Sequence, residues 1–184
     1  MLNRDFLIKF KTATETKWSQ KSIDPTLYGF QFQQGTRWNA GLSDEMIHDY
    51  ENVLKVRFPD DFKALLREMN GTDLATLNVY GSCGEPQRES FGVYSYPRDI
   101  ERVKKLIERV CTWRAEIAAN LAEQGFELPA EASLVPIYSH RYLVCTSDLD
   151  SSVVLSIVVD ATDAIVYGNS LREYLEIEFL RGGA

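Results

Sequence analysis

Residues 42–73 constrain the fold more than any other stretch, because they predict two amphipathic helices with sharp boundaries. Ser43 is a favourable N-cap, and Phe58-Pro59 interrupts the first helix and suits the start of a second. Asn70-Gly71 tolerates positive φ and ends that second helix. The apolar residues at helical spacing are Met46, Ile47, Tyr50, Val53 and Leu54, then Phe62, Leu65, Leu66 and Met69. The stretch carries no catalytic motif, so we interpret it as scaffold, with Phe62 and Leu66 as core anchors.

The chain before this stretch predicts a short helix followed by irregular structure. Apolar residues recur at helical spacing at Leu2, Phe6, Leu7 and Phe10, which predicts about three turns of helix. The polar residues 12–22 predict a loop. Residues 23–41 are rich in aromatic side chains, but Pro25, Gly29 and Gly35 prevent a long helix. We therefore expect a packed irregular segment with a short strand at 29–33.

Beyond residue 73, strand and helix patterns alternate. Strands are expected at 74–80 and 91–96, on both sides of Ser139-His140 within 134–145, at 153–159, and at 164–167. The strand at 153–159 is almost entirely apolar, which predicts burial on both faces. One long helix is expected from Pro97 to Gln124, and a closing helix after the capping box Ser170–Glu173. These elements predict a single α+β domain over residues 1–184, an antiparallel-rich mixed sheet with helices packed against it.

The negative charge is concentrated in one region of the sequence. The chain has 20 Lys and Arg, 27 Asp and Glu, and a formal net charge of −7. Residues 115–171 contain one basic residue, Arg141, among eight acidic ones, so this region accounts for the whole imbalance. Such a field repels nucleic acid and attracts a basic partner. A solvated acidic surface that only aids solubility is the alternative interpretation.

Four aspartates within this region are the candidate partner-binding residues. Asp148 and Asp150 precede the buried strand, and Asp160 and Asp163 bracket the turn after it. Strand ends and turns lie at the surface, so these carboxylates should be exposed and able to meet a basic protein. The same four could instead gather around a cation. However, they lack the glycine and the closing glutamate of a calcium loop, so we expect no metal site.

No catalytic constellation is recognisable in the sequence. His48 falls within a predicted helix, and His140 falls at a predicted hairpin tip, without partners at metal-ligand spacing. Cys145 follows His140 closely, so a Cys–His pair is an alternative to a buried thiol. No phosphate loop, dinucleotide fingerprint or hydrolase motif is present; the glycine-containing loop 81–86 lacks the lysine of a phosphate loop. We therefore expect no enzyme and no cofactor.

Cysteine usage and hydropathy indicate the compartment. Cys83, Cys111 and Cys145 are odd in number and widely separated, which is typical of reduced thiols rather than a disulfide framework. No apolar run is long enough to span a membrane, and the N-terminus does not match a signal peptide. We expect a cytoplasmic protein, whose oligomeric state the sequence leaves open.

Several segments, taken in their order along the chain, resemble the SUKH superfamily. Trp38 precedes the first of the two central helices, as is typical there. The motif segments are Phe58-Pro-Asp-Asp-Phe62, Leu65-Leu-Arg-Glu-Met-Asn-Gly71, the hairpin 134–145, and the last strand and closing helix 165–175. Together they cover roughly residues 38–180, and the segment 74–131 has no close match.

The resemblance implies a protein-binding function. SUKH proteins include bacterial immunity proteins, which mask a cognate toxin, often a nuclease, inside the producing cell. An acidic protein suits that role, because nucleases present basic surfaces to phosphate and association with them is steered by charge. The superfamily also includes fungal regulators of cell-wall synthesis, so a cytosolic scaffold or regulatory domain is the alternative.

Overall fold

The computed structural model describes residues 2–27, 29–79, 88–148, 150, 152–159 and 163–181. Its helices are α1 (Arg4–Gln20), α2 (Asp44–Leu54), α3 (Asp60–Glu68), α4 (Ile100–Thr112), α5 (Arg114–Glu123) and α6 (Leu171–Leu175), continued by the π-helical η3 (Glu176–Arg181). Its strands are β1 (Gly29–Phe32), β2 (Thr76–Val79), β3 (Arg88–Ser90), β4 (Ser133–Tyr138), β5 (Arg141–Cys145), β6 (Val154–Val158) and β7 (Asp163–Gly168). The expected loop 81–86 with Cys83, and Tyr28 and Asp160, lie outside the described residues.

The described strands form two antiparallel sheets, which confirms the α+β class. One has the order β1-β2-β3, and the other has the order β4-β5-β6-β7. Residues 92–94 join them along the free edge of β4, because Ser139 N donates to Gly92 O (2.8 Å) and Tyr94 N donates to Ile137 O (3.2 Å). The expected strand at 91–96 is therefore reduced to a bridge between Val93 and Tyr138.

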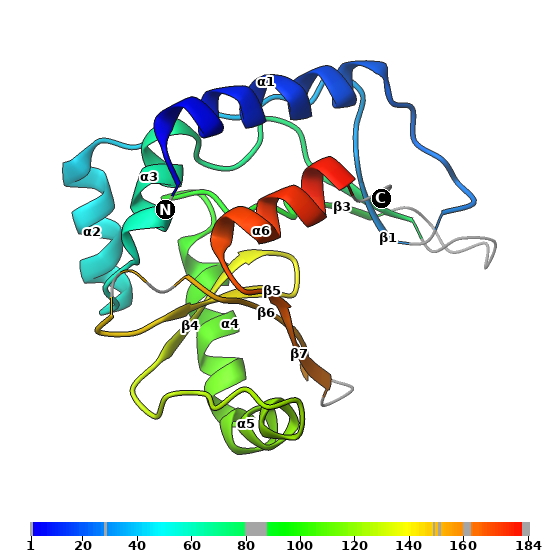
Figure 1. The fold of residues 1–184 in the computed structure, drawn as a ribbon. Helices are drawn as coiled ribbons and strands as arrows, with labels where there is room; N and C mark the ends of the chain where they lie inside the picture. The colour runs from blue at the N-terminus through cyan, green and yellow to red at the C-terminus, as the bar shows by residue number, and fades with distance from the viewer. Residues whose placement is uncertain are drawn as a thin grey trace.

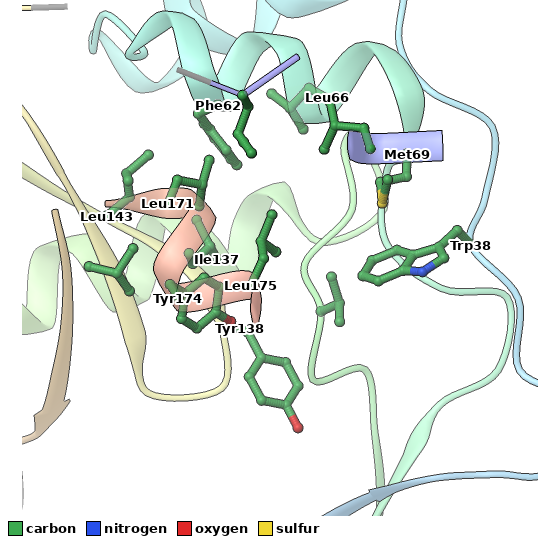
Figure 2. Close-up of a cluster of buried hydrophobic side chains, with 14 of the residues drawn as sticks. Trp38, Phe62, Leu66, Met69, Ile137, Tyr138, Leu143, Leu171, Tyr174 and Leu175 are labelled. Carbon is green, nitrogen blue, oxygen red and sulfur yellow. The ribbon is translucent and has the colours of Figure 1, made fainter. Parts of the chain in front are cut away.

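The four-stranded sheet is covered on both faces (Figure 1). On one face, α3, α6 and η3 enclose a core that joins aromatic and aliphatic side chains (Figure 2). On the other, α4 and α5 bury Val110, Ile117 and Leu121 against Tyr142, Val144 and Leu155. Val154 belongs to the first core and Leu155 to the second, so β6 is buried on both faces, as its composition predicted.

Helices α2 and α3 follow their sequence signals closely. Ser43 Oγ accepts from Met46 N (3.2 Å), which confirms the N-cap. Phe62 and Leu66 are buried, and Gly71 has φ of 72°, so the predicted core anchors and left-handed residue are also confirmed. Met46 and Val53 are exposed, contrary to expectation. The buried face of α2 is centred on Ile47, Tyr50 and Glu51, so the predicted apolar stripe was too wide.

Helix α1 is longer than predicted, since it runs through the polar residues 12–20. Thr14 and Trp18 continue the buried face at helical spacing, and Trp18 stacks on Phe32 of β1 with ring centroids 4.3 Å apart. Thr12 and Thr14 hydroxyls donate to carbonyls one turn back, at 3.0 Å each. Tertiary packing of one tryptophan thus overrides the weak helix propensity of these threonines.

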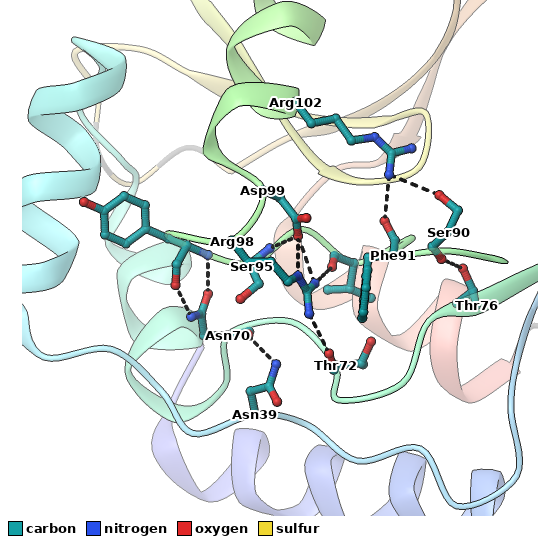
Figure 3. Close-up of polar contacts among 12 residues, drawn as sticks. Asn39, Asn70, Thr72, Thr76, Ser90, Phe91, Ser95, Arg98, Asp99 and Arg102 are labelled. Atoms are coloured by element: carbon teal, nitrogen blue, oxygen red, sulfur yellow. Dashed lines mark hydrogen bonds and ion pairs between the residues drawn. The ribbon is translucent and has the colours of Figure 1, made fainter.

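The expected single helix 97–124 is divided into two. Trp113, with φ of −105° and ψ of 19°, separates α4 from α5. A polar network holds the start of α4 (Figure 3). Asn70 makes both side-chain hydrogen bonds to the backbone of Tyr96, at 2.6 and 2.9 Å, and Arg98 Nη1 donates to Thr72 O at 2.9 Å. The residues that end α3 therefore also fix where α4 begins.

The edge strand β7 is covered at one point by α5. Asn120 Oδ1 accepts from Ala164 N (3.0 Å), and Gln124 Nε2 donates to Ala164 O (2.7 Å). Ala164 faces Ile157 of β6 in the ladder, and these two bonds leave on the side away from β6. Two amide side chains thus satisfy the outer backbone groups of this residue.

Candidate functional site

The aspartates predicted from the charge pattern do not form one cluster. Asp148 and Asp150 lie in the connection from β5 to β6, whereas Asp163 opens β7 and faces Val158 at the far end of β6. Those three are exposed, as expected for turns, and Asp160 lies outside the described residues. At about 3.3 Å per residue, the length of β6 keeps the two groups more than about 13 Å apart. The structure therefore divides the predicted surface between two ends of the sheet.

Asp148 lies beside a cleft of about 260 Å³ between β5 and the loop that follows α5. Its rim carries three exposed carboxylates, those of Glu127, Glu131 and Asp148. Its apolar lining consists of Phe126, Pro129, Val144 and Val153. We call this hollow the acidic cleft. Glu127 and Glu131 were counted in the acidic region of the sequence, but no sequence signal placed them opposite Asp148.

The glutamate side of the acidic cleft is held by backbone geometry and one arginine. Gly125 has φ of 80°, and this left-handed residue turns the chain after α5. The Arg114 guanidinium then donates to the carbonyls of Pro129 (2.6 Å), Ala130 (3.0 Å) and Ala132 (2.8 Å). These charge-assisted bonds anchor the loop that carries Glu127 and Glu131 to the start of α5.

The aspartate side is held by a local turn. Asp150 N donates to the Asp148 carboxylate (Oδ1, 3.1 Å), and the Thr146 hydroxyl donates to the Asp148 carbonyl (3.1 Å). The carboxylate keeps acceptor capacity after one such bond, since an ionised aspartate has about four lone-pair sites. Asp148 can therefore still accept from a ligand.

Carboxylates around an apolar floor match the chemistry of a long basic side chain. The methylene stem of a lysine or arginine packs on apolar surface, while its charged head stays at the rim. Carboxylates bind guanidinium and ammonium groups by charge-assisted hydrogen bonds. The acidic cleft is thus suited to basic side chains from another protein.

The histidines and Cys145 do not form a reactive pair. His48 is exposed on α2, and Cys145 is buried at one end of β5 while His140 precedes its other end. Burial, and then the Glu51 carboxylate, raise the pKa of the Cys145 thiol. Burial and the Arg141 charge lower the pKa of His140 to about 4. The Cys–His alternative is therefore wrong, since the thiol stays protonated and the length of a strand separates the two side chains.

The described residues contain neither a metal-binding cluster nor a membrane-spanning helix. Within those ranges, no three His, Cys, Asp or Glu side chains come close enough together to hold a metal ion. No helix there combines the length and apolar character needed to cross a membrane.

Comparison with known proteins gives one family. Residues 41–177 match the model of the SMI1 / KNR4 family (SUKH-1). The match spans α2 to the start of η3, and therefore includes the acidic cleft and both faces of the four-stranded sheet. No curated protein matches the chain significantly.

Proposed function

Because this chain belongs to the SMI1/KNR4 family (SUKH-1), which includes immunity proteins, we propose that it neutralises a cognate toxin by direct protein–protein contact. The single observation that supports this proposal most strongly is the acidic cleft, a ring of carboxylates over an apolar floor. The protein acts by binding and covering a surface, not by chemistry. A nuclease is the toxin class that fits best, because it must present basic side chains to hold phosphate.

The partner-facing surface is centred on the acidic cleft and on Asp148 and Asp150 beside it. Glu127 and Glu131 approach from the loop after α5, so two segments of the chain contribute charge to one hollow. Exposed charges of this kind raise the association rate and fix orientation more than they raise affinity. Asp163, at the other end of β6, contributes to the long-range field but not to this contact surface.

The direct test is co-expression with the protein encoded next to this chain. We expect the neighbour alone to arrest growth, the pair to grow, and the two purified proteins to form a complex. A non-toxic neighbour that binds this chain would instead favour the scaffold or regulatory alternative. A toxic neighbour that neither binds it nor is neutralised by it would refute the proposal.

Variants that remove carboxylate charge but keep the shape of the side chain test the acidic cleft as the contact surface. In Glu127→Gln/Glu131→Gln/Asp148→Asn, the association rate with the toxin should fall about tenfold at low salt, and less at high salt where charges are screened. Asp148→Asn alone and Asp163→Asn are the matched pair, since each removes one exposed charge, at opposite ends of β6, and the Asp163 variant should change the rate far less. Equal effects for the two variants would mean that overall charge, not the acidic cleft, steers binding.

A further inference from the structure

A buried polar junction joins four segments of the chain, and one of these segments carries Asp148 of the acidic cleft. Its two central groups are the Asp61 carboxylate, in the first turn of α3, and the Ser152 hydroxyl, two residues before β6. Leu2 N donates to Asp61 Oδ1 (2.6 Å), and Ser152 Oγ donates to Asp61 Oδ2 (3.4 Å). Leu171 N, at the start of α6, donates to Ser152 Oγ (3.2 Å). We call these four groups the Asp61 junction.

Ser152 holds the Asp61 junction together because its hydroxyl is donor and acceptor at once. It donates to a charged group, which makes a stronger bond than a neutral acceptor would. It accepts from Leu171 N, a first-turn amide that has no partner within its own helix. Ser152 and Asp61 are 4% and 7% exposed, so water cannot readily replace these bonds. The hydroxyl therefore fixes residue 152 between α3 and α6.

The segment fixed by Ser152 is the connection from β5 to β6, which carries Asp148 and Asp150. Val144 N donates to Val153 O (2.9 Å), so the two strands are joined where this connection leaves and re-enters the sheet. On the outer side, Asp150 N donates to the Asp148 carboxylate. On the inner side, the anchor is the Ser152 hydroxyl. Because both ends and the inner side of this short connection are held, the place of residue 152 limits where the Asp148 carboxylate can lie.

We propose that Asp61 and Ser152 are positioning residues, which hold the turn at Asp148 in the shape that receives a basic side chain of the toxin. This inference rests on the proposed function, since it takes the acidic cleft as the contact surface. Neither side chain is among the described residues that line the acidic cleft. They act through Asp148 by reducing the freedom of its turn before binding, which lowers the entropy cost of association. Asp61 lies within the Phe58–Phe62 motif, so that motif serves recognition as well as the core.

Hydrogen exchange of the Asp150 amide, followed by NMR in the free protein, reports how often this turn opens. Ser152→Ala should raise the exchange rate about tenfold, since the bond to a charged group and the anchor to α6 are both lost. Ser170→Ala is the matched control. It also removes a hydroxyl that accepts from a first-turn amide of α6, that of Glu173 (3.1 Å), but Ser170 does not belong to the connection. It should leave the exchange of the Asp150 amide unchanged.

A second pair of variants tests the carboxylate of the Asp61 junction. Asp61→Asn should raise the exchange rate of the Asp150 amide about threefold, because a neutral amide oxygen accepts more weakly from the Ser152 hydroxyl. Asp60→Asn is the control, since it removes the same charge from the same turn of α3 but has a side chain that is 60% exposed. Both substitutions weaken the interaction with the positive end of the helix, and only the first should affect the turn.

Binding to the protein encoded next to this chain tests the link to recognition. Ser152→Ala should weaken this binding about threefold, because a smaller fraction of the molecules holds the turn in the competent shape. In an Asp148→Asn background the same substitution should have almost no further effect, because both changes act on one contact. Ser170→Ala should not weaken binding, even where its loss of stability in denaturant unfolding is similar.

The proposal is overturned if Ser152→Ala and Ser170→Ala change the exchange rate of the Asp150 amide equally. It is also overturned if Ser152→Ala weakens binding equally with and without the Asp148 carboxylate. A neighbouring protein that fails to bind the wild-type chain refutes the proposed function instead, and the exchange rates then still decide whether the Asp61 junction positions the turn.

Discussion

The two faces of the four-stranded sheet differ in the size of their cores and in the hollows beside them. The face under α3, α6 and η3 carries the larger core, in which Trp38, Phe62 and Phe179 are at most 7% exposed. The face under α4 and α5 carries a smaller, mainly aliphatic core, with the acidic cleft at one end and a second hollow, lined by His140 and Tyr142, at the other. We therefore assign stability mainly to the first face and the proposed recognition surface to the second.

The largest effect should come from the aromatic core. Phe62→Ala removes a ring that packs edge-on against Phe58 at 5.0 Å, and we expect it to lower the free energy of unfolding by about 3–5 kcal/mol. Met46→Ala on the exposed side of α2 is the control and should cost less than about 1 kcal/mol. Denaturant unfolding measures both. Similar losses in the two variants would contradict the assignment of stability to the α3 face.

The same substitution at two glycines compares the two faces directly. Gly71 and Gly125 both have positive φ, so valine strains either turn by about 1–2 kcal/mol. A Cβ at Gly71 would also lie 2.6 Å from Ser95 Cβ, whereas nothing lies within 4 Å at Gly125. Gly71→Val should therefore destabilise the protein by about 1–3 kcal/mol more than Gly125→Val. Equal melting temperatures would show that the turn near Gly71 is free to expand.

His140, in the turn between β4 and β5, should make a pH-dependent contribution to stability. Burial and the charge of Arg141 lower the pKa of His140 in the folded protein to about 4. An unperturbed histidine has a pKa of about 6.5, so the unfolded chain binds a proton more readily between these values. The stabilising effect of a neutral His140 is therefore present above about pH 6.5 and is lost as pH falls toward 4. His140→Gln should show a shallower loss of stability than wild type between pH 7 and 4.5, and His48→Gln should not. Denaturant midpoints at the two pH values test this.

The smallest effect on stability should come from the acidic cleft. Its three rim carboxylates are exposed, and exposed charges contribute little to folding. Glu127→Gln/Glu131→Gln/Asp148→Asn should therefore change the free energy of unfolding by less than about 1 kcal/mol, even though its association kinetics change. A large loss of stability would show that these side chains are structural, which would weaken their assignment to recognition.

Helix ends that are set by a few neighbouring residues were predicted correctly from the sequence. The cap at Ser43, the positive φ at Gly71 and the N-cap at Ser170 are confirmed, since each depends on a few neighbouring residues. Glu173 N donates to Ser170 Oγ at 3.1 Å, while the Glu173 carboxylate accepts from Asn169 N at 2.8 Å, one residue before the expected partner of a capping box. The length of α1 could not be predicted in the same way. It depends on the stacking of Trp18 on Phe32, and that contact exists only after β1 is in place.

The candidate site was only partly predictable for a similar reason. The charge count correctly indicated an acidic region, and turn positions correctly indicated that Asp148 and Asp163 are exposed. Their separation could have been read from the sequence, because a buried strand lies between them. The acidic cleft depends on how the loop after α5 meets β5.

The two amide side chains on α5 also determine how far the sheet can extend. β7 (Asp163–Gly168) has neither lysine nor proline, the residues that usually protect an edge strand from pairing with another chain. Asn120 and Gln124 instead occupy the outer hydrogen-bonding groups of Ala164, where an incoming strand would have to bind. Asn120→Ala/Gln124→Ala should therefore promote self-association in a concentration-dependent way. We therefore expect the helix next to the proposed recognition surface also to limit polymerisation of the sheet beneath it.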